Sequence, residues 1–233
     1  MSYVFQFGPV LENLPRLLLG AWLTVKLSAG AMIFGTALAV ICAFLQKSRA
    51  MPVRLFVRSY VEFTRNTPFL IQLFIIYFSL PALGQQLGLV LRLDAWEAAL
   101  IGMSLNLGAY ATEIVRGGID SVAHGQIEAG AALGLGRFQI FRLIVLRQAI
   151  KTAFPALASQ FVLLMLGSSI ISAISVEELT GMTNTLQSTT FRSFEFYFAA
   201  TCLYLVMAFG FRAVLGALYW LGFVRGRPAE GRR

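Results

Sequence analysis

The stretch LLLGAWLTVKLSAGAMIFGTALAVICAFL occupies residues 17–45 and contains a single charged residue, Lys26. A helix rises about 1.5 Å per residue, so about 20 apolar residues cross the roughly 30 Å hydrocarbon core of a bilayer. A strand that crosses a membrane would be about half as long and would alternate in polarity. This uninterrupted run therefore predicts a membrane-spanning helix.

Four more apolar runs follow it along the chain. Hydrophobic residues make up 58% of the 233 residues and charged residues only 13%, whereas soluble proteins carry about 25% charged residues. The sequence therefore predicts an all-α membrane protein, a single domain over residues 1–233 with five transmembrane helices. The predicted spans cover approximately residues 17–45, 56–80, 96–115, 153–176 and 194–213. Pro81 is expected to end the second span.

Basic residues indicate how these spans are oriented. Lys and Arg gather in the segments that follow the first, third and fifth spans, including the arginine-rich tail 225–233. The opposite side carries only Arg16, Arg92 and Arg192. The positive-inside rule then predicts that the N-terminus lies outside and the C-terminus in the cytoplasm. The net charge of +8 follows from this topology, so it gives no reason to expect a nucleic-acid partner.

Residues suited to enzyme chemistry or metal binding are scarce. Serine catalysis needs a base within hydrogen-bond reach, and the single histidine, His124, falls in a loop. Cys42 and Cys202 lie in separate apolar runs, which fits neither a metal site nor a disulfide framework. No G-x-x-x-x-G-K-[ST] phosphate-binding pattern occurs. We therefore expect no enzyme activity and no cofactor bound by this chain.

The predicted cytoplasmic loop, residues 120–150, contains a short helix. Residues 127–133 favour helix, and Gly134 and Gly136 are expected to end it. Small residues on this helix would let the backbone of another protein approach closely; they are Ala129, Gly130 and Ala132. Two interpretations stay open from these residues alone. The segment is either a docking helix for a partner protein or an amphipathic helix that lies on lipid headgroups.

A motif in this loop carries a resemblance to a known family. It consists of Glu128-Ala129-Gly130, then Gly134, then Ile144-x-Leu146. This pattern resembles the EAA loop of ABC importer permeases. Two other segments, VEFTRNTP at 61–68 and SLNLGAYATEIVRGGI at 104–119, resemble polar amino-acid permeases. The similarity runs in order over roughly residues 15–215 and indicates the histidine/arginine/glutamine-type permease family.

The resemblance implies a type I ABC importer permease fold and a role as a transmembrane permease subunit. Two such subunits, identical or different, would each form half of a translocation pathway in the bacterial cytoplasmic membrane. A cytoplasmic ABC ATPase dimer, which uses ATP and Mg, would dock on the loop. The docking residues would be Glu128, Ala129, Gly130 and Gly134. An extracytoplasmic binding protein would deliver the substrate, a polar amino acid or a close derivative.

Arg65, Asn66 and Thr67 directly precede Pro68 in the predicted second span. Pro68 removes one backbone hydrogen bond, and broken helices are where transporters expose polar groups to their substrates. We therefore hypothesise that Arg65 faces the pathway and can meet a substrate carboxylate, with Asn66 and Thr67 beside it.

The fourth span departs from the family that it resembles. Leu166 and Gly167 stand where many relatives carry a Lys-Asp pair, and Arg147 stands where the loop usually has a proline. Two interpretations follow for the ligand. Either a non-identical partner permease holds it, or this subunit binds a different substrate through Ser168, Ser169 and the backbone around Gly167.

Other polar residues inside the spans have two interpretations. Glu62 can pair with Arg58 or Arg65 along one helix face. Asn106, Tyr110 and Glu113 recur at helical spacing in the third span, where Glu113 can pair with Arg116. Because polar groups inside a membrane are costly, these residues either pack against other spans or line the pathway.

The same charges support an alternative function. In an autonomous channel or proton-coupled carrier, Glu62, Arg65 and Glu113 would form a relay through the membrane. This alternative predicts transport without ATP, and it leaves the EAA-like loop without a role.

Overall fold

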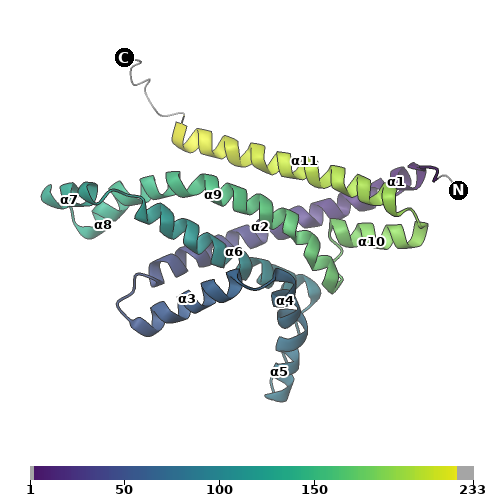
Figure 1. The fold of residues 1–233 in the computed structure, drawn as a ribbon, viewed down its shortest axis with the longest axis horizontal. Coiled ribbons are helices and arrows are strands. Elements are labelled where there is room, and N and C mark those ends of the chain that lie inside the picture. Colours follow the sequence, from purple (N-terminus) through teal and green to yellow (C-terminus); the bar gives the residue numbers. More distant parts are fainter. Residues whose placement is uncertain (1–2, 225–233) are drawn as a thin grey trace, which may run out of the picture.

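The computed structural model describes residues 3–224, which form helices joined by short turns and contain no strand. Four long helices run along the length of the molecule (Figure 1): α2 (Leu14–Leu45), α6 (Ala95–Asp120), α9 (Leu146–Gly167) and α11 (Ser193–Tyr219). The shorter elements are α1 (Gly8–Glu12), α3 (Met51–Arg65), α4 (Phe69–Phe74), η1 (Ile75–Ser79), α5 (Leu80–Gln86), α7 (His124–Ala132), α8 (Arg137–Ile140), η2 (Phe141–Val145), η3 (Ser168–Ile174), α10 (Leu179–Thr190) and η4 (Trp220–Val224). The short helices α7 and α8 lie at one end of the molecule, and α1 and α10 lie at the other.

Within residues 3–224, five helical segments are long and apolar enough to cross a membrane. They are Leu14–Leu45, Phe69–Gln86, Ala95–Asp120, Arg137–Ile174 and Ser193–Phe223. The predicted fold class, an all-α membrane protein with five spans, is therefore confirmed. The basic tail that contributed to the predicted orientation, residues 225–233, lies outside the described residues.

The second span differs most from its prediction. The helix is broken before Phe69, as expected from Pro68, but the segment long enough to cross a membrane is Phe69–Gln86 rather than residues 56–80, because α3 ends at Arg65 and remains separate from it. The break follows from Pro68, which has no N–H and disfavours a helical conformation for the residue before it. Pro81 does not end the span as expected, because it lies in the first turn of α5, where a missing N–H is tolerated. In Figure 1 the segment from α4 to α5 leaves the long bundle at a steep angle.

The helices of the third, fourth and fifth spans extend beyond their predicted bounds. The third span, predicted as 96–115, is Ala95–Asp120, and Asp94 begins it with a capping box to Glu97. The fourth, predicted as 153–176, already begins at Arg137, and the fifth, predicted as 194–213, continues to Phe223. The additional turns of the third and fourth spans carry charged residues, among them Arg116, Asp120 and Arg142, whereas those of the fifth span, residues 214–223, carry none.

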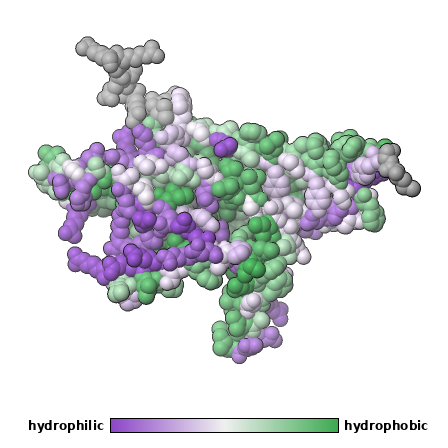
Figure 2. Space-filling view, in the orientation of Figure 1, coloured by the Kyte–Doolittle hydropathy of each residue, from purple (hydrophilic) through white to green (hydrophobic). Residues whose placement is uncertain are grey.

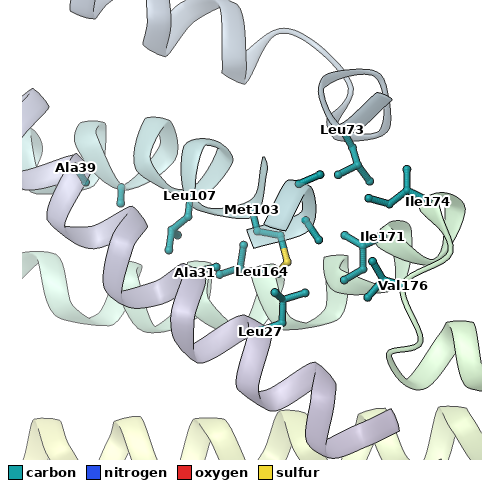
Figure 3. Close-up of a cluster of buried hydrophobic side chains, with 13 residues drawn as sticks. Leu27, Ala31, Ala39, Leu73, Met103, Leu107, Leu164, Ile171, Ile174 and Val176 are labelled. Atoms are coloured by element: carbon teal, nitrogen blue, oxygen red, sulfur yellow. The ribbon is translucent and has the colours of Figure 1, made fainter. Parts of the chain in front are cut away.

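The main core lies where α2, α6 and α9 meet. Figure 3 shows Leu27, Met103 and Leu164 from these three helices pointing toward one another. Glycines allow the close approach of α2 and α6: a Cβ on Gly35 would lie 2.9 Å from side-chain atoms of Leu107. Small residues at such contacts are the usual means of packing helices in membranes, where apolar burial alone gives no driving force.

The break between α3 and α4 is held by the side chain of Gln72, which is almost fully buried. Its Nε2 donates to the carbonyl oxygens of Thr64 (2.7 Å) and Thr67 (3.0 Å) and lies 2.8 Å from Thr67 Oγ1. Its Oε1 accepts from Asn106 Nδ2 at 3.2 Å. Carbonyls left free by the break are thereby satisfied without water, as a membrane interior requires.

A second buried polar cluster lies at the end of the bundle that carries α10. Glu178 is fully buried and caps α10, accepting from the Gly181 N–H at 2.9 Å. Its other oxygen accepts from Tyr204 Oη (2.7 Å) and Thr24 Oγ1 (3.3 Å). Burial raises the pKa of the Glu178 carboxyl. The cluster joins α10 to α2 and α11, and no motif in the sequence indicates it.

Replacing Gln72 by Leu is expected to lower the thermal unfolding midpoint of the detergent-purified chain by several degrees. The change leaves buried carbonyls at Thr64 and Thr67 unpaired, and each such group costs about 1–3 kcal/mol. Gln86→Leu is the control, because it makes the same change at an exposed position of the same span. Equal midpoints for the two variants would contradict a structural role for Gln72.

Candidate functional site

A cavity of about 260 Å³ lies beside the break in the second span. Its polar lining is uncharged and comes from two helices, with Asn106 and Tyr110 from α6 and Gln160 from α9. The rest of the lining is Phe69, Leu163, Leu164, Gly167 and Ile170. Such a mostly apolar cavity with a few convergent polar groups is typical of a small-molecule site.

Arg65 lies next to this cavity through its contact with Tyr110. The guanidinium carbon is 5.5 Å from the centroid of the Tyr110 ring, within cation–π range. The Tyr110 hydroxyl donates to the Arg65 carbonyl oxygen at 3.4 Å, which joins α6 to the end of α3. Arg65 is exposed and forms no ion pair with another residue between 3 and 224, so its guanidinium group is accessible to an anionic group.

Asn66 and Thr67 use their polar side chains within the break itself. Asn66 Nδ2 donates to the carbonyl oxygen of Glu62 (2.8 Å), and Thr67 Oγ1 donates to that of Phe63 (2.8 Å). Both therefore cap the end of α3. The predicted break in the helix is present. However, Gln72 and these two side chains already donate hydrogen bonds to carbonyl oxygens around the break, which were expected to face a substrate.

The two serines of the fourth span are placed differently from each other. Ser168 is fully buried and donates to the carbonyl oxygen of Met165 at 2.7 Å, so its hydroxyl is already paired within its own span. Ser169 is partly buried and donates to the carbonyl oxygen of Leu166 at 3.1 Å. Neither lines the cavity beside Arg65, whereas the backbone of Gly167 does.

Asn106, Tyr110 and Glu113 form a polar stripe along α6, which continues from the cavity toward the end of the helix. Asn106 bonds to Gln72, and Glu113 forms the predicted ion pair with Arg116, at 2.6 Å. Gln46 Nε2 also approaches Glu113, at 3.4 Å. The pair predicted for Glu62 is absent, since Glu62 is exposed and forms no ion pair with another described residue.

The helix predicted over residues 127–133 is present as α7, with Glu128 and Ala129 exposed on its surface. Gly130 instead faces the chain's own return segment, because a Cβ there would lie 2.7 Å from Ile144 Cδ1. It was expected to offer a small surface to another protein, so this part of the prediction is wrong. Gly134 ends the helix with φ +79°, and the Leu135 N–H donates back to the Gly130 carbonyl oxygen at 3.1 Å.

Two residues of this region carry signals that the sequence analysis did not use. Gln72 and Gln160 are isolated amides within apolar runs, and polar side chains in such places usually bond to a neighbouring helix or face a cavity. Gln72 does the first and Gln160 the second. Hydropathy alone does not say which of the two applies.

Comparison with known proteins identifies the family of this bundle. Residues 35–219 match the model of the family described as "Binding-protein-dependent transport system inner membrane component". The chain belongs to this family. A crystal structure of an amino acid ABC transporter with histidines superposes with a TM-score of 0.84 at 32% identity, covering 93% of this chain and 99% of that chain. The fold is therefore that of an ABC importer permease, and the family recognised in the sequence is confirmed.

Two sequence relatives from the same family cover nearly the whole chain. One is the nopaline transport system permease protein of Agrobacterium fabrum, 34% identical over 91% of this chain and 90% of the relative. The other is the putative glutamine transport system permease protein of Rickettsia felis, 35% identical over 88% of this chain and 91% of the relative. The chain is accordingly a multi-pass permease component of an ABC transporter, and such components are not themselves enzymes.

Replacing Gly134 by Val is expected to disorder the end of α7. A β-branched residue at φ +79° is strained by at least about 1 kcal/mol, and the bond from Leu135 to Gly130 depends on that conformation. Limited proteolysis of the purified protein should cut the segment between α7 and α8 faster than in the wild type. Gly125→Val is the control, because Gly125 has no positive φ and open space around its Cβ position. Equal cleavage of the two variants would contradict the role of Gly134.

Proposed function

We propose that this chain is the transmembrane permease subunit of an ATP-driven bacterial importer for polar amino acids or close derivatives. The family assignment supports an importer subunit. The printed functions of the relatives, nopaline and glutamine transport, support an amino acid or an amino-acid derivative as substrate. The chain would form half of the pathway, with a second permease subunit forming the rest.

The observation that carries this proposal is the exposed face of α7. Glu128 and Ala129 point outward, while Gly130 lets the helix rest on Ile144 of the return segment. A short helix that packs against its own chain on one side and is exposed on the other can transmit the displacement of a bound partner to the rest of the chain. In the proposed complex, α7 faces the cytoplasm and docks on an ABC ATPase dimer that binds ATP and Mg. An extracytoplasmic amino-acid-binding protein would dock at the opposite end.

The proposed pathway runs past Arg65 and the cavity lined by Asn106, Tyr110 and Gln160. A substrate carboxylate would bind the Arg65 guanidinium, because such pairs form two parallel hydrogen bonds. The amides and the phenol would contact polar groups of the substrate side chain. Movement of α7 would be transmitted through α6 to the cavity, and this movement would produce alternating access.

The alternative, an autonomous channel or proton-coupled carrier, has weaker support. A proton relay would use Glu113, whose carboxylate is already held by Arg116 at 2.6 Å. The two functions differ in one measurable respect, because a carrier moves substrate without ATP. Uptake that continues after ATP is removed would favour the carrier.

Replacing Glu128 by Arg is expected to uncouple ATP hydrolysis from uptake. The complete complex, reconstituted in proteoliposomes with its ATPase and binding protein, should still insert and hydrolyse ATP but should lose about nine-tenths of its uptake, since a reversed charge at a docked contact costs at least 1.4 kcal/mol. Glu12→Arg is the control, because it reverses an exposed charge on α1, at the other end of the molecule. Wild-type uptake by Glu128→Arg would contradict the docking role of α7.

Replacing Arg65 by Ala is expected to lower uptake about 10- to 100-fold, since a charge-assisted hydrogen bond contributes about 1.5–3 kcal/mol. Assembly with the ATPase should be unchanged, as judged by co-purification. Arg54→Ala provides the matched control, because Arg54 is an exposed arginine of the same helix that lines none of the cavities described. If both variants transport at the wild-type rate, Arg65 is not on the pathway.

A further inference from the structure

A second cavity, of about 350 Å³, lies toward the end of the bundle that carries α7. It is built by α3, by the last turns of α6, and by Gln46, which directly follows α2. Its lining is almost entirely polar and consists of Gln46, Arg58, Val61, Glu62, Arg65, Glu113 and Arg116. Figure 2 shows hydrophilic side chains gathered over this part of the molecule, around α3.

Some of these charges are already paired. Glu113 accepts from Arg116 (2.6 Å) and Gln46 (3.4 Å), and Arg116 also bonds to Asp120 at 3.1 Å. Asp120 in turn binds Lys47 at 3.0 Å. These contacts join the ends of α2 and α6, so they account for one acidic and one basic side chain of the lining.

Three charges of the lining are left, all on α3. Arg58, Glu62 and Arg65 are exposed, and none of them forms an ion pair with another residue between 3 and 224. Their spacing of four and three residues would allow pairs along the helix. The structure instead directs two guanidinium groups and one carboxylate, unpaired, to the same cavity.

This set of charges matches one class of ligand. A free α-amino acid carries a carboxylate and an ammonium group on the same carbon, which suit an arginine and a glutamate respectively. A simple anion would leave Glu62 without a cationic partner, and a simple cation would leave Arg58 and Arg65 without an anionic one. Val61 is the only apolar residue of the lining, so the cavity offers little to distinguish one amino-acid side chain from another.

We propose that this cavity binds free α-amino acids with little selectivity, and that its occupation slows the transport cycle. This inference rests on the proposed function, in which the α7 end faces the cytoplasm, where imported amino acid accumulates. Arg65 gives the physical link, since it lines this cavity and also contacts Tyr110 of the other one. A guanidinium group engaged by a carboxylate on the cytoplasmic side is less available to the next substrate.

The test uses the complete importer in proteoliposomes with the ATPase facing outward and the binding protein and substrate enclosed. ATP hydrolysis is measured while glycine, acetate or methylamine is added outside at millimolar concentrations. Glycine should slow hydrolysis, whereas acetate and methylamine, which carry only one of its two charges, should not. Inhibition by acetate equal to that by glycine would overturn the proposal, because a simple anion would then suffice.

Variants locate the effect within the cavity. Glu62→Gln and Arg58→Gln should raise the glycine concentration for half-inhibition about tenfold, relative to each variant's own uninhibited rate, which corresponds to about 1.4 kcal/mol. Arg54→Gln, on the same helix but outside the lining, should leave it unchanged. An equal glycine concentration for half-inhibition in all three variants would contradict the proposed site.

The experiment distinguishes failure of the cavity proposal from failure of the proposed function. If the wild-type importer couples hydrolysis to transport but glycine does not slow it, the cavity proposal is wrong and the proposed function stands. If no ATP-dependent transport occurs, the proposed function is wrong. Calorimetry of glycine with the purified chain and with Glu62→Gln then tests the site directly, and equal heats from both proteins would overturn it.

Discussion

The carboxamide of Gln72 is the interaction on which the functional region of this permease depends. A membrane offers no water to backbone carbonyls, so a break inside a span is stable only where the protein supplies the missing donors. Gln72 gives its amide to Thr64 and Thr67 and takes a hydrogen bond from Asn106 of α6. The bent second span is thereby fixed in place and attached to the helix that carries the polar stripe.

Several features follow from that attachment. With α3 ending at the break, Arg65 lines the polar cavity and lies against Tyr110, which lines the other one. The same helix α6 continues without interruption to Asp120, and only three residues separate it from the start of α7 at His124. Near that end, a Cβ on Gly118 would lie 2.7 Å from the Ala149 carbonyl oxygen, so α6 and α9 are in close backbone contact. Movement of α7 would therefore be transmitted to the cavity by two packed helices rather than by a flexible loop.

The sequence predicts the features that local chemistry determines. Apolar run lengths give the five spans, Pro68 gives the break, and Gly134 gives the end of α7. Features that depend on tertiary contacts are missed. The burial of Ser168, the role of Gln72 and the fully buried Glu178 all require knowing which helix lies opposite. The absent pair at Glu62 is of the same kind, because spacing shows that two charges can meet but not that they do.

The proposed docking of α7 on an ATPase is tested most directly by site-specific crosslinking in the assembled importer. A single cysteine introduced by Leu133→Cys, directly after α7 and 81% exposed, should crosslink to the partner ATPase in a background lacking Cys42 and Cys202. A cysteine introduced by Phe191→Cys, 86% exposed in the turn between α10 and α11, should not. Crosslinking from Phe191→Cys and none from Leu133→Cys would contradict the proposed docking of α7.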